Sequence, residues 1–208
     1  MLAEKRTETI APGAMLLRGF AQEASHALVD LVASIASTAP FRHMVTRGGH
    51  SMSVAMANCG RVGWTSDETG YRYSPVDPQT GLPWPAMPSL FLKLAQTAAA
   101  EGGFADFEPD ACLINRYEPG ARMGLHQDKD ERGFDAPIVS VSLGLPATFL
   151  FGGKRRSDPV QRFQLESGDV VVWGGPTRLY YHGITALKDG NHPLTGRTRI
   201  NLTFRRAL

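Results

Sequence analysis

Hydrophobic and polar residues alternate from Thr198 to Arg205 with the period of two that is typical of a β-strand. The apolar face is expected to pack against a core and consists of Ile200, Leu202 and Phe204. The other face carries two guanidinium groups, an amide and a hydroxyl but no acid: Arg199, Asn201, Thr203 and Arg205. Because a planar guanidinium binds a carboxylate through two hydrogen bonds, this face suits a small dicarboxylate. The other interpretation is an exposed basic strand edge that resists aggregation.

Two further segments have helical spacing. One runs from Ala21 to Thr38, and the other begins with Ser89 as its N-cap and ends at Gly102-Gly103. The chain before Ala21 predicts no regular element. Beyond Asp110, Gly and Pro separate short runs that predict strands. These runs are Ala111 to Tyr117, Pro137 to Leu145, Thr148 to Phe151, Arg162 to Leu165, Asp169 to Trp173, Leu179 to His182 and Thr198 to Phe204. The pattern predicts a β-sandwich or jelly roll with two helices outside it.

A long segment rich in Gly and Pro, Gly60 to Pro88, separates the two predicted helices. It contains several large aromatic residues, Trp64, Tyr71, Tyr73 and Trp84. Long loops in compact domains are often functional lids, and flat rings suit a flat ligand such as a nucleobase. The alternative is that the rings anchor the loop to the β-core, which we prefer for Trp84 because prolines flank it.

Composition limits the class of protein. A chain of 208 residues suits one domain, and 42% hydrophobic with 20% charged residues is ordinary for a globular fold. The net charge of +2 does not require a polyanionic partner. Two cysteines without a C-x-x-C spacing predict reduced thiols, and no apolar run is long enough for a membrane. We therefore expect a monomeric, cytoplasmic protein that does not associate with membranes.

The residues with the clearest chemistry are His126 and Asp128, together with His182. Residues at i and i+2 of an extended strand point to the same side, so His126 and Asp128 can reach one ion while His182 arrives from a partner strand. Two imidazoles and one carboxylate form the facial triad of non-haem Fe(II) oxygenases. A short His/Asp pair alone is weak support, but the basic strand near the C-terminus strengthens it.

Several segments together resemble the AlkB family of Fe(II)- and 2-oxoglutarate-dependent dealkylases. They are Asn115-Arg116-Tyr117, His126 to Asp130, Ser140 to Gly144, Gly168 to Gly175, His182, Arg199 to Arg205, Met52 to Met56 and the Pro-Trp-Pro around Trp84. The resemblance covers about Phe41 to Arg205. It implies an α+β, mainly β, fold in a single domain, 1–208. This domain has a double-stranded β-helix (jelly-roll) core at about 109–208, N-terminal helices packed outside, and a nucleotide-recognition lid at about 41–88.

The resemblance also implies roles for residues around the metal. His126, Asp128 and His182 would bind Fe(II), with 2-oxoglutarate and O2 as cosubstrates. Arg205 would hold the distal carboxylate of 2-oxoglutarate and Arg199 would lie near the end that chelates iron. Further hydrogen bonds to 2-oxoglutarate would come from Asn115, Tyr117 and Asn201.

For the substrate, the resemblance implies a lid that holds the damaged nucleotide and includes Trp64, Tyr71, Arg72 and Tyr73. Asp130 would lie at the edge of the base. Arg156 would contact the nucleic acid, although the run Lys154-Arg155-Arg156 can also be a solvated turn. Two departures from the resembled pattern, at His50 and from Glu131 to Ala136, leave the contacts to the bound strand open.

The expected activity is oxidative demethylation of N1-methyladenine and N3-methylcytosine in single- or double-stranded DNA, with RNA left open, releasing formaldehyde and succinate. Both lesions are cationic, so an indole face at Trp64 and a carboxylate at Asp130 would favour them over neutral bases. Two alternatives are an oxygenase of the same fold that acts on RNA or protein, and a non-catalytic nucleic-acid binding module.

Overall fold

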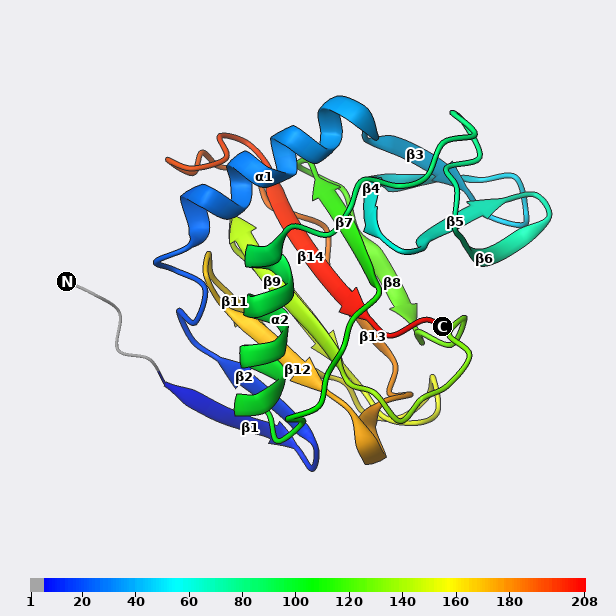
Figure 1. The fold of residues 1–208 in the computed structure, drawn as a ribbon. Coiled ribbons are helices and arrows are strands. Elements are labelled where there is room, and N and C mark those ends of the chain that lie inside the picture. Colours follow the sequence, from blue (N-terminus) through cyan, green and yellow to red (C-terminus); the bar gives the residue numbers. More distant parts are fainter. Residues whose placement is uncertain (1–5) are drawn as a thin grey trace.

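The computed structural model describes residues 6–208 and contains two α-helices and fourteen strands within that range (Figure 1). The elements are β1 (Thr7–Ala11), β2 (Ala14–Leu17), α1 (Ser25–Thr38), β3 (Arg42–Val45), β4 (Ser51–Gly60), β5 (Gly63–Asp67), β6 (Gly70–Ser74), α2 (Ser89–Glu101), β7 (Ala111–Tyr117), β8 (Met123–His126), β9 (Ile138–Gly144), β10 (Ala147–Phe151), β11 (Gln161–Leu165), β12 (Val170–Trp173), the 3-10 turn η1 (Gly175–Thr177), β13 (His182–Ile184) and β14 (Arg199–Arg205).

The strands form two main antiparallel sheets and a separate hairpin. The large sheet has the order β1-β2-β12-β9-β14-β7-β4-β3, and the small sheet has the order β11-β10-β13-β8. Strands β5 and β6 pair only with each other. Both helices lie on one face of the large sheet (Figure 1). This arrangement confirms the predicted jelly-roll core with helices packed outside it.

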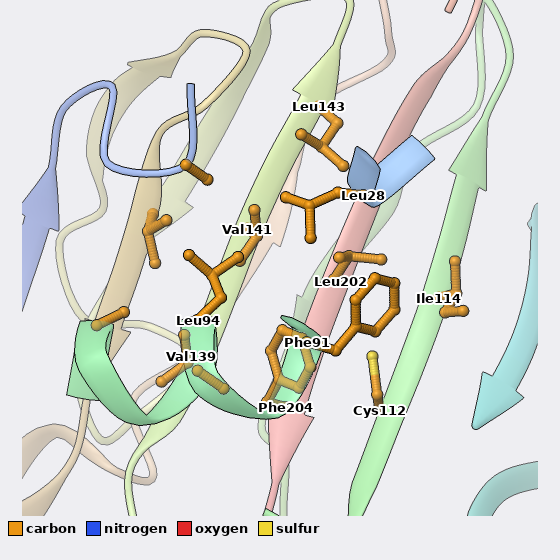
Figure 2. Packing of buried hydrophobic residues seen from close by; sticks show 14 of the residues in the cluster. Leu28, Phe91, Leu94, Cys112, Ile114, Val139, Val141, Leu143, Leu202 and Phe204 are labelled. Atoms are coloured by element: carbon orange, nitrogen blue, oxygen red, sulfur yellow. The ribbon is translucent and has the colours of Figure 1, made fainter. Parts of the chain in front are cut away.

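Two layers of apolar side chains hold the fold together. The outer layer lies between the helices and the large sheet, where Leu28 of α1 and Phe91 of α2 meet Leu202 and Phe204 of β14 (Figure 2). Phe91 and Phe204 pack edge to face with ring centroids 5.9 Å apart. The inner layer lies between the two sheets and includes Leu113, Phe149, Phe151, Trp173 and Ile184. The predicted site residues also lie between the two sheets, next to this inner layer.

Strand β14 lies in the middle of the large sheet, with β7 on one side and β9 on the other. Its apolar face joins the outer layer, as its sequence predicts. Its polar face is also buried, since Arg199 is 1% and Arg205 6% exposed. The interpretation of this segment as an exposed basic edge is therefore wrong, because both edges of the strand are paired and the second sheet covers its polar face.

Part of the segment interpreted as a long loop, Gly60 to Pro88, is β-structure. Strand β4 pairs with β7 from Ala55 to Gly60 and extends the large sheet, while β5 and β6 form the hairpin. The β1–β2 hairpin was also missed. Strands β1 and β2 are only five and four residues long, and β2 is apolar throughout, so this hairpin shows no alternation that could be recognised. Trp84 is 5% exposed and donates its Nε1 hydrogen to the Ser74 carbonyl at 2.9 Å, so it is an anchor, as preferred.

Element boundaries also differ in a few places. Helix α1 begins at Ser25 instead of Ala21, and Ser89 is the first helical residue of α2, with Pro88 at the N-cap position. The strand expected to end at His182 instead begins there. Within the described residues, no helix combines the length and the apolar character needed to cross a membrane.

Replacing Phe204 by alanine should lower the free energy of unfolding by about 3–5 kcal/mol, because it leaves a cavity against Phe91 in the outer layer. Denaturant unfolding followed by circular dichroism measures this change. Leu208→Ala, at a residue that is 41% exposed, is the control and should change stability little. Equal losses in the two variants would contradict the assignment of Phe204 to the core.

Candidate active site

A cavity of 520 Å³ lies between the two sheets and beneath the β5–β6 hairpin. Strands β7 and β14 of the large sheet and β8 and β13 of the small sheet contribute to its wall. All but one of the predicted site residues line it: Trp64, Tyr71, Tyr73, Asn115, Tyr117, His126, Asp128, Asp130, Arg156, His182, Arg199, Asn201 and Arg205. The remaining residue, Arg72, pairs with Asp67 inside the hairpin at 2.6 Å and lies outside the cavity wall.

The two histidines face each other across a pair of strands. His126 is the last residue of β8 and His182 the first of β13, and they are direct partners in the antiparallel register. Asp128 follows β8 by two residues. One potential ligand atom from each of the three residues lies within 4.8 Å of the others, so these atoms can meet at one ion. The predicted arrival of His182 from a partner strand is confirmed.

Hydrogen bonds fix the orientation of both imidazoles. His126 Nδ1 lies 2.9 Å from the Gly124 carbonyl, and His182 Nδ1 lies 3.0 Å from the Tyr180 carbonyl. A carbonyl can only accept, so each Nδ1 carries the hydrogen and each Nε2 keeps its lone pair. The Nε2 atoms point to Asp128, at 3.5 Å for His126 and 3.7 Å for His182. This set of two nitrogen donors and one carboxylate fits a ferrous ion.

The protonation of the cluster suits metal binding as well. Burial lowers the pKa of His182 to about 4, so its ring is neutral at physiological pH. Burial alone would raise the pKa of Asp128, but the charge of Arg205, the two neighbouring imidazoles and the hydrogen bond from Arg205 together outweigh it and hold the pKa of this carboxyl well below its usual range. Both residues are therefore in the form that binds a cation.

The two arginines of β14 have different surroundings. Arg205 donates to Asp128 Oδ2 from Nε at 2.9 Å and from Nη2 at 2.6 Å, and its Nε lies 3.3 Å from Glu131. Arg199 donates to Ser142 Oγ at 2.9 Å and lies over the ring of Tyr117, 5.0 Å from its centroid. Its Nε and Nη1 are buried and have no hydrogen-bond partner within residues 6–208.

The two arginines of β14 lie at different places along the cavity, and their assignment to the distal and the iron-chelating ends of 2-oxoglutarate stays a prediction. Arg205 lies at the metal end of the cavity, because it binds the carboxylate of a ligand. Arg199 is six residues away along an extended strand, which places their main chains roughly 20 Å apart. Sequence parity put both side chains on the correct face but could not show which one lies beside the metal, since that depends on where Asp128 falls after β8.

The cavity floor between the arginines is polar. Asn201 donates to Ser140 Oγ at 2.8 Å and to the Val141 carbonyl at 3.0 Å, and its Oδ1 accepts from Thr203 at 2.9 Å. Asn115 donates to the same Oδ1 at 3.3 Å, while its own Oδ1 has no partner. Unsatisfied buried groups of this kind are rare in folded proteins, and they can bond a polar ligand or an ordered water.

The lid contributes aromatic rings to the mouth of the cavity. Trp64 and Tyr71 stack, with ring centroids 5.6 Å apart and 20° between their planes. Trp64 donates its Nε1 hydrogen to Asp130 at 2.8 Å, so the acid fixes the plane of the indole. Tyr73 donates to Glu131 at 2.9 Å. The guanidinium of Arg156 lies 5.9 Å from the centroid of the Tyr181 ring, and both residues line the cavity.

Two residues that the sequence interpretation did not assign to the site are buried beside it. Glu131 accepts from Tyr73 and pairs with Arg205, and Arg178 pairs with Glu131 at 3.1 Å. Both side chains are nearly inaccessible, at 1% and 3%. The segment from Glu131 to Ala136 has no periodic pattern, so the only signal was a further acid directly after His126–Asp130.

The pattern of the 2OG-Fe(II) oxygenase superfamily matches residues 13–205. The chain is 61% identical over 205 residues to the alpha-ketoglutarate-dependent dioxygenase AlkB of Escherichia coli (strain K12), which covers 99% of this chain and 95% of that protein. This chain belongs to the AlkB family. Another AlkB-family relative, the DNA N(6)-methyladenine demethylase ALKBH1D of Arabidopsis thaliana, is 41% identical over 124 residues, which is 52% of this chain and 27% of that protein.

The AlkB-family fold is found again in the solved structure of OsALKBH1, which superimposes with a TM-score of 0.85 at 30% identity and covers 97% of this chain and 100% of that chain. The protein is thus an Fe(II)- and 2-oxoglutarate-dependent dioxygenase. The predicted family, enzyme class and cofactors are confirmed. The alternative of a non-catalytic binding module is wrong, because the family is defined by its metal chemistry and the three ligand residues converge.

His126→Ala should abolish binding of Fe(II), or of Mn(II) as its redox-stable substitute, while leaving the melting temperature close to that of the wild type. The ring is 35% exposed and its one protein hydrogen bond among the described residues is to Gly124, so its removal costs little packing. Titration of the metal-free protein measures the affinity. His26→Ala, at an exposed position of α1, should bind metal normally. Full affinity in the His126 variant would contradict the triad.

Proposed function

We propose that the protein oxidatively demethylates N-alkylated bases in DNA, N1-methyladenine and N3-methylcytosine in particular, as direct repair of alkylation damage. The observation that carries this proposal is that an aromatic lid tied to Asp130 covers the same cavity that holds the metal triad. The Arabidopsis relative is a DNA N(6)-methyladenine demethylase, which supports the same substrate class. Activity on RNA, a monomeric state and a cytoplasmic location stay predictions.

The different surroundings of the two arginines favour one orientation of the cosubstrate along the polar floor. We infer that Arg199 receives the distal carboxylate of 2-oxoglutarate, because it has two unpaired buried donors and Tyr117 beside it. Asn115 and Asn201 line the path towards the triad. Arg205 keeps Asp128 ionised and in place at the other end. The chemistry that bound Fe(II) and 2-oxoglutarate supply is oxidation of an N-methyl group by dioxygen, with succinate, carbon dioxide and formaldehyde as products.

The mouth of the cavity favours a cationic base over a neutral one. The indole of Trp64 offers a π-face, and a cation over such a face gains about 0.5–2 kcal/mol depending on desolvation. The carboxylate of Asp130 stands at the edge of the indole and adds a negative charge. The methyl group blocks the pairing edge of the lesion, so the base must leave the duplex to enter, and a base that cannot pair is easier to extrude.

The remaining lid residues have supporting positions. Arg72 is bound to Asp67 and Thr69 at the turn of the hairpin, which makes it a group that shapes the lid. Tyr71 stacks on Trp64 and is 48% exposed, so part of its ring is accessible to a base. Arg156, exposed at the rim, supplies a positive charge for the phosphate backbone.

Arg199→Met should weaken 2-oxoglutarate binding about 10- to 100-fold, because hydrogen bonds to a charged group contribute about 1.5–3 kcal/mol. The variant should lose little stability, since two of the donors that it removes lack partners among the described residues and only the hydrogen bond to Ser142 is lost. Calorimetric titration of the Mn(II)-loaded protein measures the affinity. Arg162→Met, at an exposed position of β11, is the matched control. Unchanged affinity in the Arg199 variant would refute its role at the distal carboxylate.

An oligonucleotide with one N1-methyladenine tests the proposed function directly. With Fe(II), 2-oxoglutarate and oxygen, the wild-type protein should produce succinate, formaldehyde and restored adenine in equal amounts. Succinate formation with no change in methylated DNA would favour the alternative of an RNA or protein substrate.

Trp64→Ala should lower the yield of restored adenine per succinate at least several-fold, because the lesion loses its stacking surface while the metal and cosubstrate sites remain. Trp64→Phe keeps a ring but loses the bond to Asp130, and should lie between the wild type and the alanine variant. Leu82→Ala, exposed and outside the cavity wall, is the control. A parallel loss of succinate and adenine in Trp64→Ala would argue against the lid role.

A further inference from the structure

One buried cation near the site has no part in the function proposed above. Arg178 follows the η1 turn and is 3% exposed. Its Nη1 donates to the main-chain carbonyl of Asp128 at 2.8 Å, and its Nε donates to the carbonyl of Ala136 at 3.0 Å. Its Nη2 forms an ion pair with Glu131 Oε2 at 3.1 Å, although the two groups are not aligned for a hydrogen bond. The ring of Phe134 lies 5.5 Å from the guanidinium carbon and covers it.

All four of these contacts fall in one segment, residues 128–136. This segment lies between β8 and β9 and has no strand pairing of its own. It nevertheless carries the metal ligand Asp128, the lid partner Asp130 and the buried acid Glu131. Main-chain carbonyls that no sheet satisfies need other donors. Arg178 supplies donors to two of them, so a single side chain replaces part of the hydrogen bonding that a strand would provide.

The same stretch of chain that carries Arg178 leads directly to the third ligand, His182. Next to Arg178, the carbonyl of Leu179 accepts a hydrogen bond from Gln127 Nε2 at 2.6 Å. The pair of contacts, Arg178 to Asp128 and Gln127 to Leu179, joins the segment with two ligands to the segment with the third. The distance between the ligand-bearing segments is therefore set by these side chains and not by sheet pairing alone.

We propose that Arg178 is a positioning residue of the metal centre, which fixes the main chain of Asp128 while Arg205 fixes its carboxylate. An arginine is required because its planar fork reaches three acceptors in different directions, whereas a lysine ammonium is a point charge on a flexible stem. Glu131 lies between the two arginines and balances their charge. This inference rests on the assignment of the triad to the metal, and it is independent of which base is the substrate.

Mn(II) titration of the full chain, with the melting temperature measured on the same samples, tests this proposal. Arg178→Met and Arg178→Lys should each bind Mn(II) about 10- to 100-fold more weakly, the range typical for loss of a group that orients a metal ligand. Titration well below the melting temperature of every variant separates affinity from unfolding. The lysine variant keeps the buried positive charge and so serves if the methionine variant does not fold.

Arg18→Met is the matched control for stability. Arg18 also binds a main-chain carbonyl, that of Gln164 at 2.6 Å, and a carboxylate, that of Asp169 at 2.8 Å, but it lies outside the cavity wall. This variant should lose stability and still bind Mn(II) like the wild type. Asp128→Ala should bind no Mn(II) and serves as the reference for a lost ligand.

The possible outcomes distinguish an error in the role of Arg178 from an error in the assignment of the metal triad. Wild-type Mn(II) affinity in a folded Arg178 variant would overturn the role of Arg178, and so would an equal loss of affinity in Arg18→Met, because affinity would then follow stability. If the wild type and Asp128→Ala bind Mn(II) equally, the triad itself is wrong. Weak binding confined to the Arg178 and Asp128 variants supports the positioning role.

Discussion

Two arginines on one central strand are buried in this protein, and the rest of the site depends on which groups pair with their positive charges. Burying a guanidinium is costly unless it is paired and hydrogen-bonded. Arg205 meets this requirement through Asp128 and Glu131, and so brings the metal ligand to the floor of the cavity. Arg199 has only a serine hydroxyl and a tyrosine ring beside it. Among residues 6–208, carboxylates therefore pair with Arg205, whereas none pairs with Arg199.

The sequence predicts those structural features that follow from the period of two of a β-strand. The alternation along β14 placed its four polar residues on one face and its apolar residues in the core, and both placements are confirmed. The spacing of His126 and Asp128 predicted convergence with His182, which the register of β8 and β13 confirms. In each case, side chains alternate between the two faces of a strand, so the position of a residue in the sequence determines the face on which it lies.

Features that depend on contacts between distant segments could not be predicted in this way. Strand β4, at the start of the lid region, forms because it finds a partner in β7, more than fifty residues further along the chain. The order of Arg199 and Arg205 along the cavity depends on the course of the irregular chain after β8. Arg178 is a basic residue in a stretch without periodic pattern, and its burial follows only from the folding of residues 128–136 around it. Resemblance to a family supplied the roles that periodicity could not.

The unpaired donors of Arg199 also have a thermodynamic consequence for the chain in a cell. A dicarboxylate that binds only the folded form shifts the folding equilibrium by mass action, by about 2.7 kcal/mol when its concentration is one hundred times its dissociation constant. The population of unfolded chains open to proteases then falls as the keto acid becomes more abundant. The concentration of the keto acid would in this way influence how long each enzyme molecule survives, in addition to how fast it turns over.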